Sequence, residues 1–562
     1  MSQFELYALN QSVESNHTDQ IIINDLHGLN IFNEIFKKQV SKLVVSQCNP
    51  FALDYIPVNL IELKIEKCEL FTIEQVWFPP YLQVLSLKYN QIVNVNALAH
   101  LSCLKQLSLG GNQIVNIQPL TQLTSLTCLQ LWDNLLQSIL GIEYLRNLSE
   151  LNLQNNQIFD LSPLNNLVSL KTLVLSNNSI SDIIYLRNLN NLAQLYLDQN
   201  QIYNISPLSN LTNLKVLSIA QNLISNVNPV SNLTQLTELH LNDNKISYIS
   251  DLTQNISLIK LNLAQNAISD INPLKNLIQI KDLRLNNNKI SDISVLECLV
   301  DLELVYLDSN SIIDISAFKR HQNLTVLDLN SNQISDISPL ASILSLNKIC
   351  LHNNQINSIQ SLASLQNLKE CCLGQNQISF LYPLRNLIQL ESLHLWSNKI
   401  NEITFLKKLK LLKNLSIDQN NIVDVSALNY LSNLTEVSAS QNQICEIQLN
   451  TDTIQQLTIF QNYITNQDQI NSLNNKNYII GEQFTPNSRL ILLSRQIQNI
   501  YVFNDKIQYM NNKRQHITSS IRKFNYQIRQ LQTKMNAYQE VFAYNVINLF
   551  QHQINSLEYS QQ

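Results

Sequence analysis

The feature that most constrains this chain is a repeat in which one pattern returns at every twenty-second position. Its clearest copy is LDLNSNQISDISPL, residues 327–340, and an asparagine marks the same position in most other copies. Upstream, Cys68 and Cys48 take that position, and Asn462 marks a late copy at a spacing of twenty. We count about twenty repeats over residues 40–466. The seventeen asparagines with unbroken period are Asn90, Asn112, Asn134, Asn156, Asn178, Asn200, Asn222, Asn244, Asn266, Asn288, Asn310, Asn332, Asn354, Asn376, Asn398, Asn420 and Asn442.

Each unit follows the pattern L-x-x-L-x-L-x-x-N-x-I-x-x-I-x-x-L. The L-x-L segment alternates, which predicts a short strand with leucines inward and their neighbours outward. One unit cannot bury its own apolar side, but stacked units form a continuous core behind parallel strands. We expect the asparagine amide to bond backbone groups in its own loop and the next, with cysteine as a weak substitute.

Proline supports the same register. Seven of the twelve prolines lie seven residues after the asparagine, where a fixed φ and a missing N–H suit the first position of a short helical turn. A preceding serine or asparagine can cap that turn. The convex side therefore has room for a helical turn and not for a long helix. The seven are Pro119, Pro163, Pro207, Pro229, Pro273, Pro339 and Pro383.

The pattern resembles the 22-residue class of leucine-rich repeat proteins, which includes a regulatory subunit of type-1 protein phosphatase and the bacterial internalins. The composition, rich in Asn, Gln and Ile, also resembles leucine-rich repeat proteins of protists. The resemblance implies an α/β solenoid, a horseshoe of about twenty repeats with a parallel sheet on its concave face. Because this class shares a scaffold rather than a task, it implies protein binding only in general terms.

We predict four segments. Residues 1–39 form an N-terminal cap, 40–466 the solenoid, 467–497 a C-terminal cap and 498–562 a basic amphipathic helical tail. The start shows no signal peptide, no run is long and apolar enough to span a membrane, and the nine cysteines are scattered. These observations favour a cytoplasmic protein.

The sequence carries no motif for a reaction. Nucleotide-binding glycine loops, the H-E-x-x-H zinc motif and the G-x-S-x-G serine elbow are absent, and six glycines leave little for a phosphate-binding loop. The recurring SDIS segments are explained by turn chemistry. We therefore expect a protein-binding scaffold or adaptor that is not an enzyme and needs no cofactor. The resemblance adds a second option, a regulatory subunit of a phosphatase or other enzyme.

The concave surface is the expected binding site. With the asparagine as position 0, positions −6, −4 and −2 face outward and position −1 lies at the rim. From Asn90 to Asn462 these positions hold eleven acidic and four basic residues, which favours a partner with a basic surface and disfavours nucleic acid. Acidic residues that merely keep a long sheet soluble are the alternative. The residues are Asp133, Glu150, Asp198, Glu238, Asp243, Asp282, Asp308, Asp328, Glu370, Asp418 and Glu436, against Lys88, Lys260, Arg284 and Lys348.

Aromatic residues also fall at outward positions. Two of the three tryptophans lie at −2, and an outward tryptophan on a strand is typical of a binding hot spot. The strand preference of aromatic residues and stacking between strands are the alternative explanation. The predicted partner-binding residues are Trp132, Tyr196, Glu238, His240, Asp243, Tyr306, His352, His394 and Trp396.

Zinc-type ligands lie in one row of three consecutive repeats. Cys350, Cys372 and His394 share position −4, and His352 lies beside Cys350. The outer two start about 10 Å apart by strand spacing, which is too far for zinc–ligand bonds of about 2.0–2.3 Å without convergence. We therefore predict no metal site.

The tail changes period. Apolar residues from Ile500 to Leu549 follow a spacing of three and four, which predicts a long helix, and seven Lys or Arg residues lie between Lys506 and Gln539 without an acid. Three interpretations stay open: a helical hairpin that caps the last repeats, a coiled coil that makes a homodimer through residues 498–562, or a docking helix.

Overall fold

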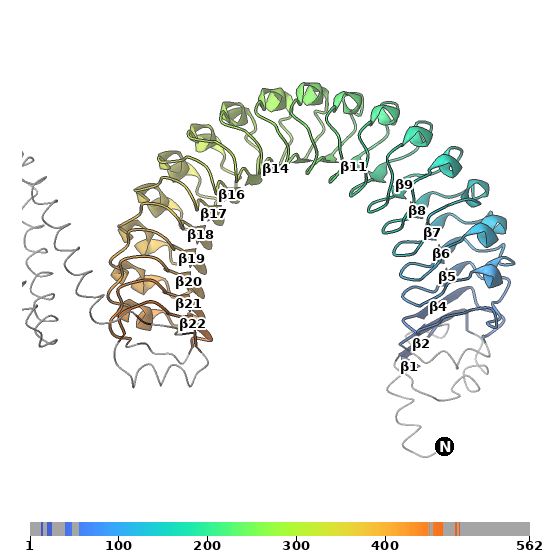
Figure 1. Cartoon of the computed structure of the whole chain (residues 1–562), viewed down its shortest axis with the longest axis horizontal. Helices are drawn as coiled ribbons and strands as arrows, with labels where there is room; N and C mark the ends of the chain where they lie inside the picture. Colours follow the sequence, from blue (N-terminus) through green and yellow to red (C-terminus); the bar gives the residue numbers. More distant parts are fainter. Residues whose placement is uncertain are drawn as a thin grey trace, which may run out of the picture.

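The computed structural model describes residues 56–447 and 453–464 continuously, together with 13–14, 20–24, 40–47, 449, 478–479 and 483. The predicted tail and most of both predicted caps lie outside these residues, as does Cys48. The described part is an open arch, with strands on the inner, concave side and short 3-10 helices on the outer, convex side (Figure 1). This is the predicted horseshoe solenoid.

Nearly every repeat contributes one strand and one 3-10 helix. The strands are β1 Val13–Glu14, β2 Gln20–Asn24, β3 Lys42–Ser46, β4 Glu62–Glu66, β5 Val84–Ser86, β6 Gln106–Ser108, β7 Cys128–Gln130, β8 Glu150–Asn152, β9 Thr172–Val174, β10 Gln194–Tyr196, β11 Val216–Ser218, β12 Glu238–His240, β13 Lys260–Asn262, β14 Asp282–Arg284, β15 Leu304–Tyr306, β16 Val326–Asp328, β17 Lys348–Cys350, β18 Glu370–Cys372, β19 Ser392–His394, β20 Asn414–Ser416, β21 Glu436–Ser438 and β22 Gln456–Thr458.

The 3-10 helices follow the strands along the convex side. They are η2 Asn96–Leu98, η3 Gln118–Gln122, η4 Ile142–Tyr144, η5 Ser162–Leu164, η6 Ile184–Leu186, η7 Ser206–Leu208, η8 Asn228–Val230, η9 Ser250–Gln254, η10 Asn272–Asn276, η11 Ser294–Cys298, η12 Ser316–Arg320, η13 Ser338–Ser342, η14 Gln360–Ser364, η15 Tyr382–Asn386, η16 Thr404–Lys408 and η17 Ser426–Tyr430.

The sheet is continuous through the described strands. From β2 to β22 each strand pairs in parallel with the next one in the chain, while β1 and β2 pair antiparallel. Partners lie one full repeat apart through most of the array, as in Leu261 opposite Leu283. The sheet also includes β2, which lies one repeat length upstream of β3, within the segment predicted as a cap.

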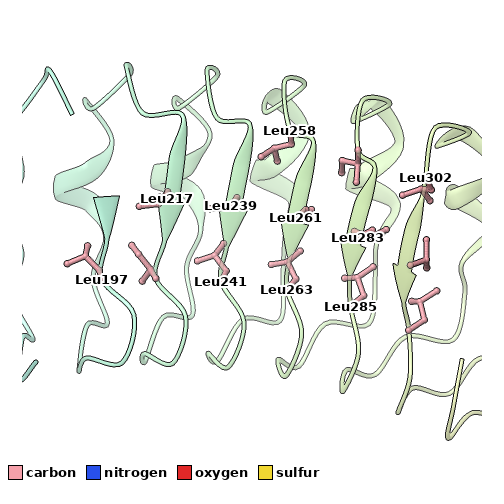
Figure 2. Packing of buried hydrophobic residues seen from close by; sticks show 14 of the residues in the cluster. Leu197, Leu217, Leu239, Leu241, Leu258, Leu261, Leu263, Leu283, Leu285 and Leu302 are labelled. Carbon is pink, nitrogen blue, oxygen red and sulfur yellow. The ribbon is translucent and has the colours of Figure 1, made fainter. Parts of the chain in front are cut away.

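The core follows the sequence pattern. Leucines at −5 and −3, such as Leu261 and Leu263, point away from the concave side and stack in rows between neighbouring repeats (Figure 2). Both are at most 1% exposed. Since each repeat covers the apolar side of the one before it, the predicted continuous core is confirmed.

The asparagine at position 0 is a structural residue, as predicted, but one of its partners differs from the prediction. Asn266 Nδ2 donates to the carbonyls of Leu263 and Leu241, at 3.1 and 3.0 Å, and its Oδ1 accepts from the N–H of Ile246 at 3.0 Å. The second loop therefore belongs to the preceding repeat and not to the next. Cys68 substitutes weakly, as expected, since its Sγ lies 3.3 Å from the Glu66 carbonyl oxygen.

The residue before each asparagine, at position −1, adopts the left-handed conformation, which the sequence analysis missed. Its φ is 54° at Gln265, where the strand ends and the chain turns so that Asn266 points inward. Glutamine pays a steric cost in this region that asparagine and glycine largely avoid. Side chains at this position are therefore held at the edge of the sheet in a fixed direction.

The seven repeat prolines lie within their 3-10 helices as expected, at the first or second position, but the capping residue differs from the prediction. In the repeat of Asn332 the N–H of Ser338 donates to Asp336 Oδ1 at 2.8 Å, and the hydroxyl of Ser338 donates to Oδ2 at 2.9 Å. The cap is thus the Asp or Asn at position +4, and the serine is the group that it holds. These two bonds lower the pKa of Asp336.

Two buried positions break the apolar rule of the repeat. Position +11 is usually leucine, but Asn255 and His321 occupy it and are fully buried. Neither imidazole nitrogen of His321 has a hydrogen-bond partner of good geometry, and Phe318 contacts the ring edge to face at 5.4 Å. Burial lowers the pKa of His321, so the ring is neutral in the fold.

We expect His321→Leu to raise the free energy of unfolding by about 1 kcal/mol or more at neutral pH, because it removes a buried unpaired polar group. Because the pKa of His321 is lower folded than unfolded, the unfolded chain takes up the proton first as pH falls below about 6.5. The variant should therefore lose less stability than wild type on acidification, measured by denaturant unfolding at several pH values. His100→Leu, at an exposed position, is the control, and an equal gain there would contradict the explanation.

No helix in the described part of the chain combines the length and the apolar character that a membrane crossing requires.

Candidate functional site

The concave face consists of three rows of side chains. Because the strands align in register, residues at positions −6, −4 and −2 form rows that run from repeat to repeat, as Tyr306, Asp328 and Cys350 do at −4. The predicted binding residues all belong to these rows or to position −1. Eight of the nine are half-buried and Asp243 is exposed. Most of these side chains therefore pack against their neighbours and do not extend freely into solvent.

Trp132 lies over a glycine of the preceding repeat. A Cβ atom built on Gly110 would fall 2.2 Å from the indole Cε2, and one on Gly111 would fall 2.9 Å from Tyr89 Cδ1. The rings of Tyr89 and Trp132 meet edge to face at 5.2 Å, although their strands are two repeats apart. We call Tyr89, Gly110, Gly111 and Trp132 the first aromatic cluster.

Trp396 repeats this arrangement twelve repeats later. A Cβ on Gly374 would fall 2.4 Å from both Cε2 and Nε1 of its indole. The ring centroids of His352 and Trp396 are 6.2 Å apart, with Gly374 between them in the row at position −2. We call His352, Gly374 and Trp396 the second aromatic cluster. In both clusters glycine lets a large ring lie against the sheet.

The sequence analysis did not identify glycine as the packing partner of each tryptophan, although the spacing that indicates it is present in the sequence. Two of the six glycines, Gly110 and Gly374, stand exactly one repeat before the two outward tryptophans. The rings face outward as predicted, but packing on the sheet covers part of their surface. We therefore expect alanine at either tryptophan to lower the stability of the fold, because it removes this packing.

Ion pairs engage all of the predicted basic residues on this surface but only three of its eleven acidic residues, Glu238, Asp282 and Glu370. All four predicted basic residues contact carboxylates: Lys88 with Glu66, Lys260 with Glu238, Arg284 with Asp282 and Lys348 with Glu370. Glu238, which also lies 3.9 Å from His240, is therefore less available to a partner than the exposed Asp243.

A row of lysines at the edge of the sheet was also missed. Position −7, just before each strand, carries six exposed lysines and two glutamates from Lys105 to Lys413. This edge offsets part of the acidic excess in the rows beside it. The lysines are Lys105, Lys171, Lys215, Lys281, Lys369 and Lys413, and the glutamates are Glu303 and Glu391.

Other predicted residues have local partners. The Arg284 guanidinium lies over the Tyr306 ring at 5.1 Å, and the Ser392 hydroxyl lies 3.0 Å from His394 Nε2. Burial, helped by Glu238 and Asp198, raises the pKa of Tyr196. The concave rows thus contain many small polar networks along one surface.

A group of half-buried acidic and imidazole side chains lies beside the second aromatic cluster. Burial raises the pKa of Asp308, and it raises the pKa of Asp328 to about 6, with a further contribution from Asp308. Burial also lowers the pKa of His352 and of His394. Charged forms are disfavoured there, which suits contact with an apolar or aromatic group.

The row of Cys350, Cys372 and His394 follows three neighbouring strands. Cys350 and Cys372 lie opposite each other on β17 and β18, and His394 follows on β19. Contact with Cys372 and burial raise the pKa of the Cys350 thiol, which disfavours the thiolate that zinc requires. Within the described residues, no three His, Cys, Asp or Glu side chains are placed to hold a metal ion.

We expect purified protein to contain no stoichiometric zinc by elemental analysis. Cys372→Ser, at a half-buried position, should change the free energy of unfolding by less than about 0.5 kcal/mol. One zinc per chain that disappears in this variant would contradict the prediction.

The hollows on the described surface are shallow. One of ≈ 340 Å³ is bounded by Lys369, Glu370, Glu391, Ser392, Lys413 and Asn414, and opens to solvent along the sheet edge. Its lining is polar and charged, whereas small-molecule sites are concave and mostly apolar. The geometry therefore fits a broad contact better than an enclosed ligand.

Comparisons with known proteins agree with this architecture. The family model for the leucine rich repeat matches residues 58–114, and the model for two copies of leucine rich repeats matches 212–254, 256–298, 300–342 and 322–364. No curated protein matches the chain.

Several solved structures are similar. A leucine-rich repeat protein of Leptospira interrogans is 25% identical, covers 64% of this chain and 96% of its own, and has a TM-score of 0.60. An internalin from Listeria monocytogenes is 33% identical over 60% of this chain and 87% of its own, with a TM-score of 0.47. The ectodomain of an Arabidopsis thaliana membrane receptor kinase, in complex with CASPARIAN STRIP INTEGRITY FACTOR 2, is 18% identical over 83% and 67%, with a TM-score of 0.60.

The repeat, the parallel sheet that it builds and the matching family models together show that this chain belongs to the leucine-rich repeat proteins.

Proposed function

We propose that the chain is a non-enzymatic binding scaffold whose concave face binds a partner protein at the two aromatic clusters. The observation that carries this proposal is the seating of Trp132 on Gly110 and of Trp396 on Gly374. An indole already held against the sheet loses little conformational freedom on binding, so its apolar contact contributes more to affinity.

The extent of the surface supports a macromolecular partner. The two clusters lie twelve repeats apart along one sheet, so a ligand that touches both must be large. The plant receptor ectodomain, which shares the fold, is in complex with a second molecule named as an integrity factor.

No disulfide joins the eight described cysteines, which supports a cytoplasmic protein in a reducing compartment.

Charged residues should determine the rate of association with the partner, and the aromatic clusters should determine the affinity. Exposed Asp243 and the carboxylate of Asp133, beside Trp132, favour a partner with basic groups, although the lysine edge at position −7 limits the net effect. Asp243→Lys should slow association, and added salt should reduce the difference from wild type.

The test begins with affinity purification of partners on the intact chain. The binding of each identified partner is then measured with Trp132→Ala, Trp396→Ala and Trp77→Ala. Trp77, the third tryptophan, is 53% exposed but lies outside the strands and serves as the matched control. We expect each concave variant to weaken binding by about 2 kcal/mol if its cluster is a hot spot, and the control to bind as wild type does.

Wild-type affinity in both concave variants would contradict the proposal. If deletion of residues 498–562 abolished binding at the same time, the tail would be the binding segment.

A further inference from the structure

The repeat of Asn376 departs from the capping pattern on the convex side at two positions at once. In the repeat of Asn332 the sequence SDISPL places Asp336 where it caps Ser338. In the repeat of Asn376 the corresponding sequence is SFLYPL, with Phe380 and Tyr382 in place of the aspartate and serine. Their exposed fractions are 51% and 39%. This repeat loses a polar cap and gains two exposed rings.

These rings form a defined cluster with a third one from the next repeat. Phe380 and Tyr382 stack at 5.8 Å with an interplanar angle of 11°, and Phe405 meets them edge to face at 5.4 and 5.5 Å. The guanidinium of Arg385 lies 3.5 Å from the centre of the Tyr382 ring. We call Phe380, Tyr382 and Phe405 the convex aromatic cluster.

Cations continue the patch across the following helices. Lys407 and Lys408 end η16, and Lys410 follows them. Lys407 and Lys410 lie 4.9 and 5.6 Å from the ring centre of Tyr430, which is 53% exposed at the end of η17. Neither Arg385 nor these three lysines form a salt bridge with another residue of the described segments. Lys410 Nζ donates to the carbonyl oxygen of Tyr430, and no described carboxylate neutralises the four cations.

The fold alone gives no reason for this arrangement. A lost cap costs about 1 kcal/mol, and exposed rings beside cations add no core. Positions where a chain breaks its own local rule without a gain in packing are often functional. Arg and aromatic residues are also the commonest residues of binding hot spots. The 3-10 helices η15, η16 and η17, which carry most of these residues, lie on the outer side of the arch, away from the concave sheet (Figure 1).

We propose that this convex patch, Arg385 and Lys407–Lys410 together with the convex aromatic cluster and Tyr430, binds an acidic segment of a second protein that also carries an aromatic side chain. Carboxylates of the segment pair with the cations, and its ring packs on Phe380. This surface is separate from the concave face and does not depend on the function proposed for it.

One observation favours a short protein segment over nucleic acid or an anionic membrane. Glu402 and Asp424 occupy the same position as Phe380 in the next two repeats, and they would repel a continuous row of phosphates. A short segment can bind the cations without reaching these carboxylates.

The test uses the full chain and a fluorescent peptide of four Glu-Glu-Phe-Gly units. A peptide with Gln in place of Glu measures how much the negative charges contribute to binding. A peptide with Ala in place of Phe measures how much the aromatic rings contribute. Phe380→Asp with Tyr382→Ser restores the cap of the other repeats, so this variant should fold at least as well as wild type. It should nevertheless bind the peptide about tenfold more weakly or worse.

A charge variant gives an independent measurement. Lys407→Glu with Lys408→Glu should also lower affinity at least about tenfold, with a salt-dependent effect. Lys319→Glu with Arg320→Glu changes the same two positions of another repeat, at the end of η12, and should bind as wild type does. Both substitutions lie at helix ends outside the core.

Four results would overturn the proposal. The first is that the acidic aromatic peptide does not bind to wild type, and the second is that all variants bind it equally. The third and fourth are that polyuridylate, or phosphatidylserine vesicles, bind in a way that depends on the patch while the peptide does not bind. Self-association of the wild type that is lost in both patch variants would instead identify a second copy as the occupant.

Discussion

Replacing Asn266 by alanine is expected to lower the free energy of unfolding by about 2–4 kcal/mol. The amide makes hydrogen bonds with Leu241, Leu263 and Ala264 carbonyls and with the N–H of Ile246, at 3.0–3.1 Å. Alanine leaves these backbone groups without their partners in a part-buried loop. Because repeats are stabilised mainly by their neighbours, the loss acts on two repeats together.

Denaturant unfolding of the full chain measures the effect, and Asn276→Ala is the matched control. Asn276 ends η10 in the same repeat and its side chain is exposed, so its replacement should cost less than about 0.5 kcal/mol. A similar small change for Asn266→Ala would show that water satisfies the loop and that the asparagine ladder adds little stability.

The sequence was sufficient for the parts of the structure that recur in every repeat. Alternating leucines define the strand, and a constant period requires neighbouring strands to align, so the sheet, the core and the concave rows were all predictable. Asn266 illustrates the limit. Its amide chemistry identified it as a structural residue. Which neighbouring loop it bonds depends on how the repeats stack, and the sequence of a single repeat does not determine that.

The parts that were not predicted depend on differences between repeats. The lysine row at position −7 was missed because that position lies before the strand and outside the alternation used to define the surface. The cap was assigned to serine or asparagine because these residues commonly cap helices. In the structure the carboxylate of Asp336, two residues before Ser338, accepts the hydrogen bond from the N–H of Ser338. The contact between Trp396 and Gly374 joins two repeats, so inspection of either repeat alone does not reveal it.

The second large effect is expected at Gly374. Gly374→Ser should destabilise the chain by about 2–3 kcal/mol, because the new side chain would occupy the space of the Trp396 indole and force the ring off the sheet. Serine occupies the same position in other repeats, at Ser176 and Ser440, so the substitution itself suits the strand end. Gly374 does not have a left-handed φ, and the backbone therefore accepts a side chain.

A double-mutant cycle separates the contact with the ring from every other consequence of the substitution. In a chain that already carries Trp396→Ser, Gly374→Ser should cost less than about 0.5 kcal/mol, which gives a coupling energy of roughly 2 kcal/mol between the two positions. Tryptophan fluorescence should also change in the single variant Gly374→Ser, since the displaced indole becomes exposed to water. An equal cost in both backgrounds would mean that the glycine serves the backbone and not the ring. Trp396 would then be free to move, and the argument that it is a rigid anchor for a partner would fail with it. If the coupling is found, the same Gly374→Ser chain should bind an identified concave partner more weakly, even though every side chain of the second aromatic cluster is still present.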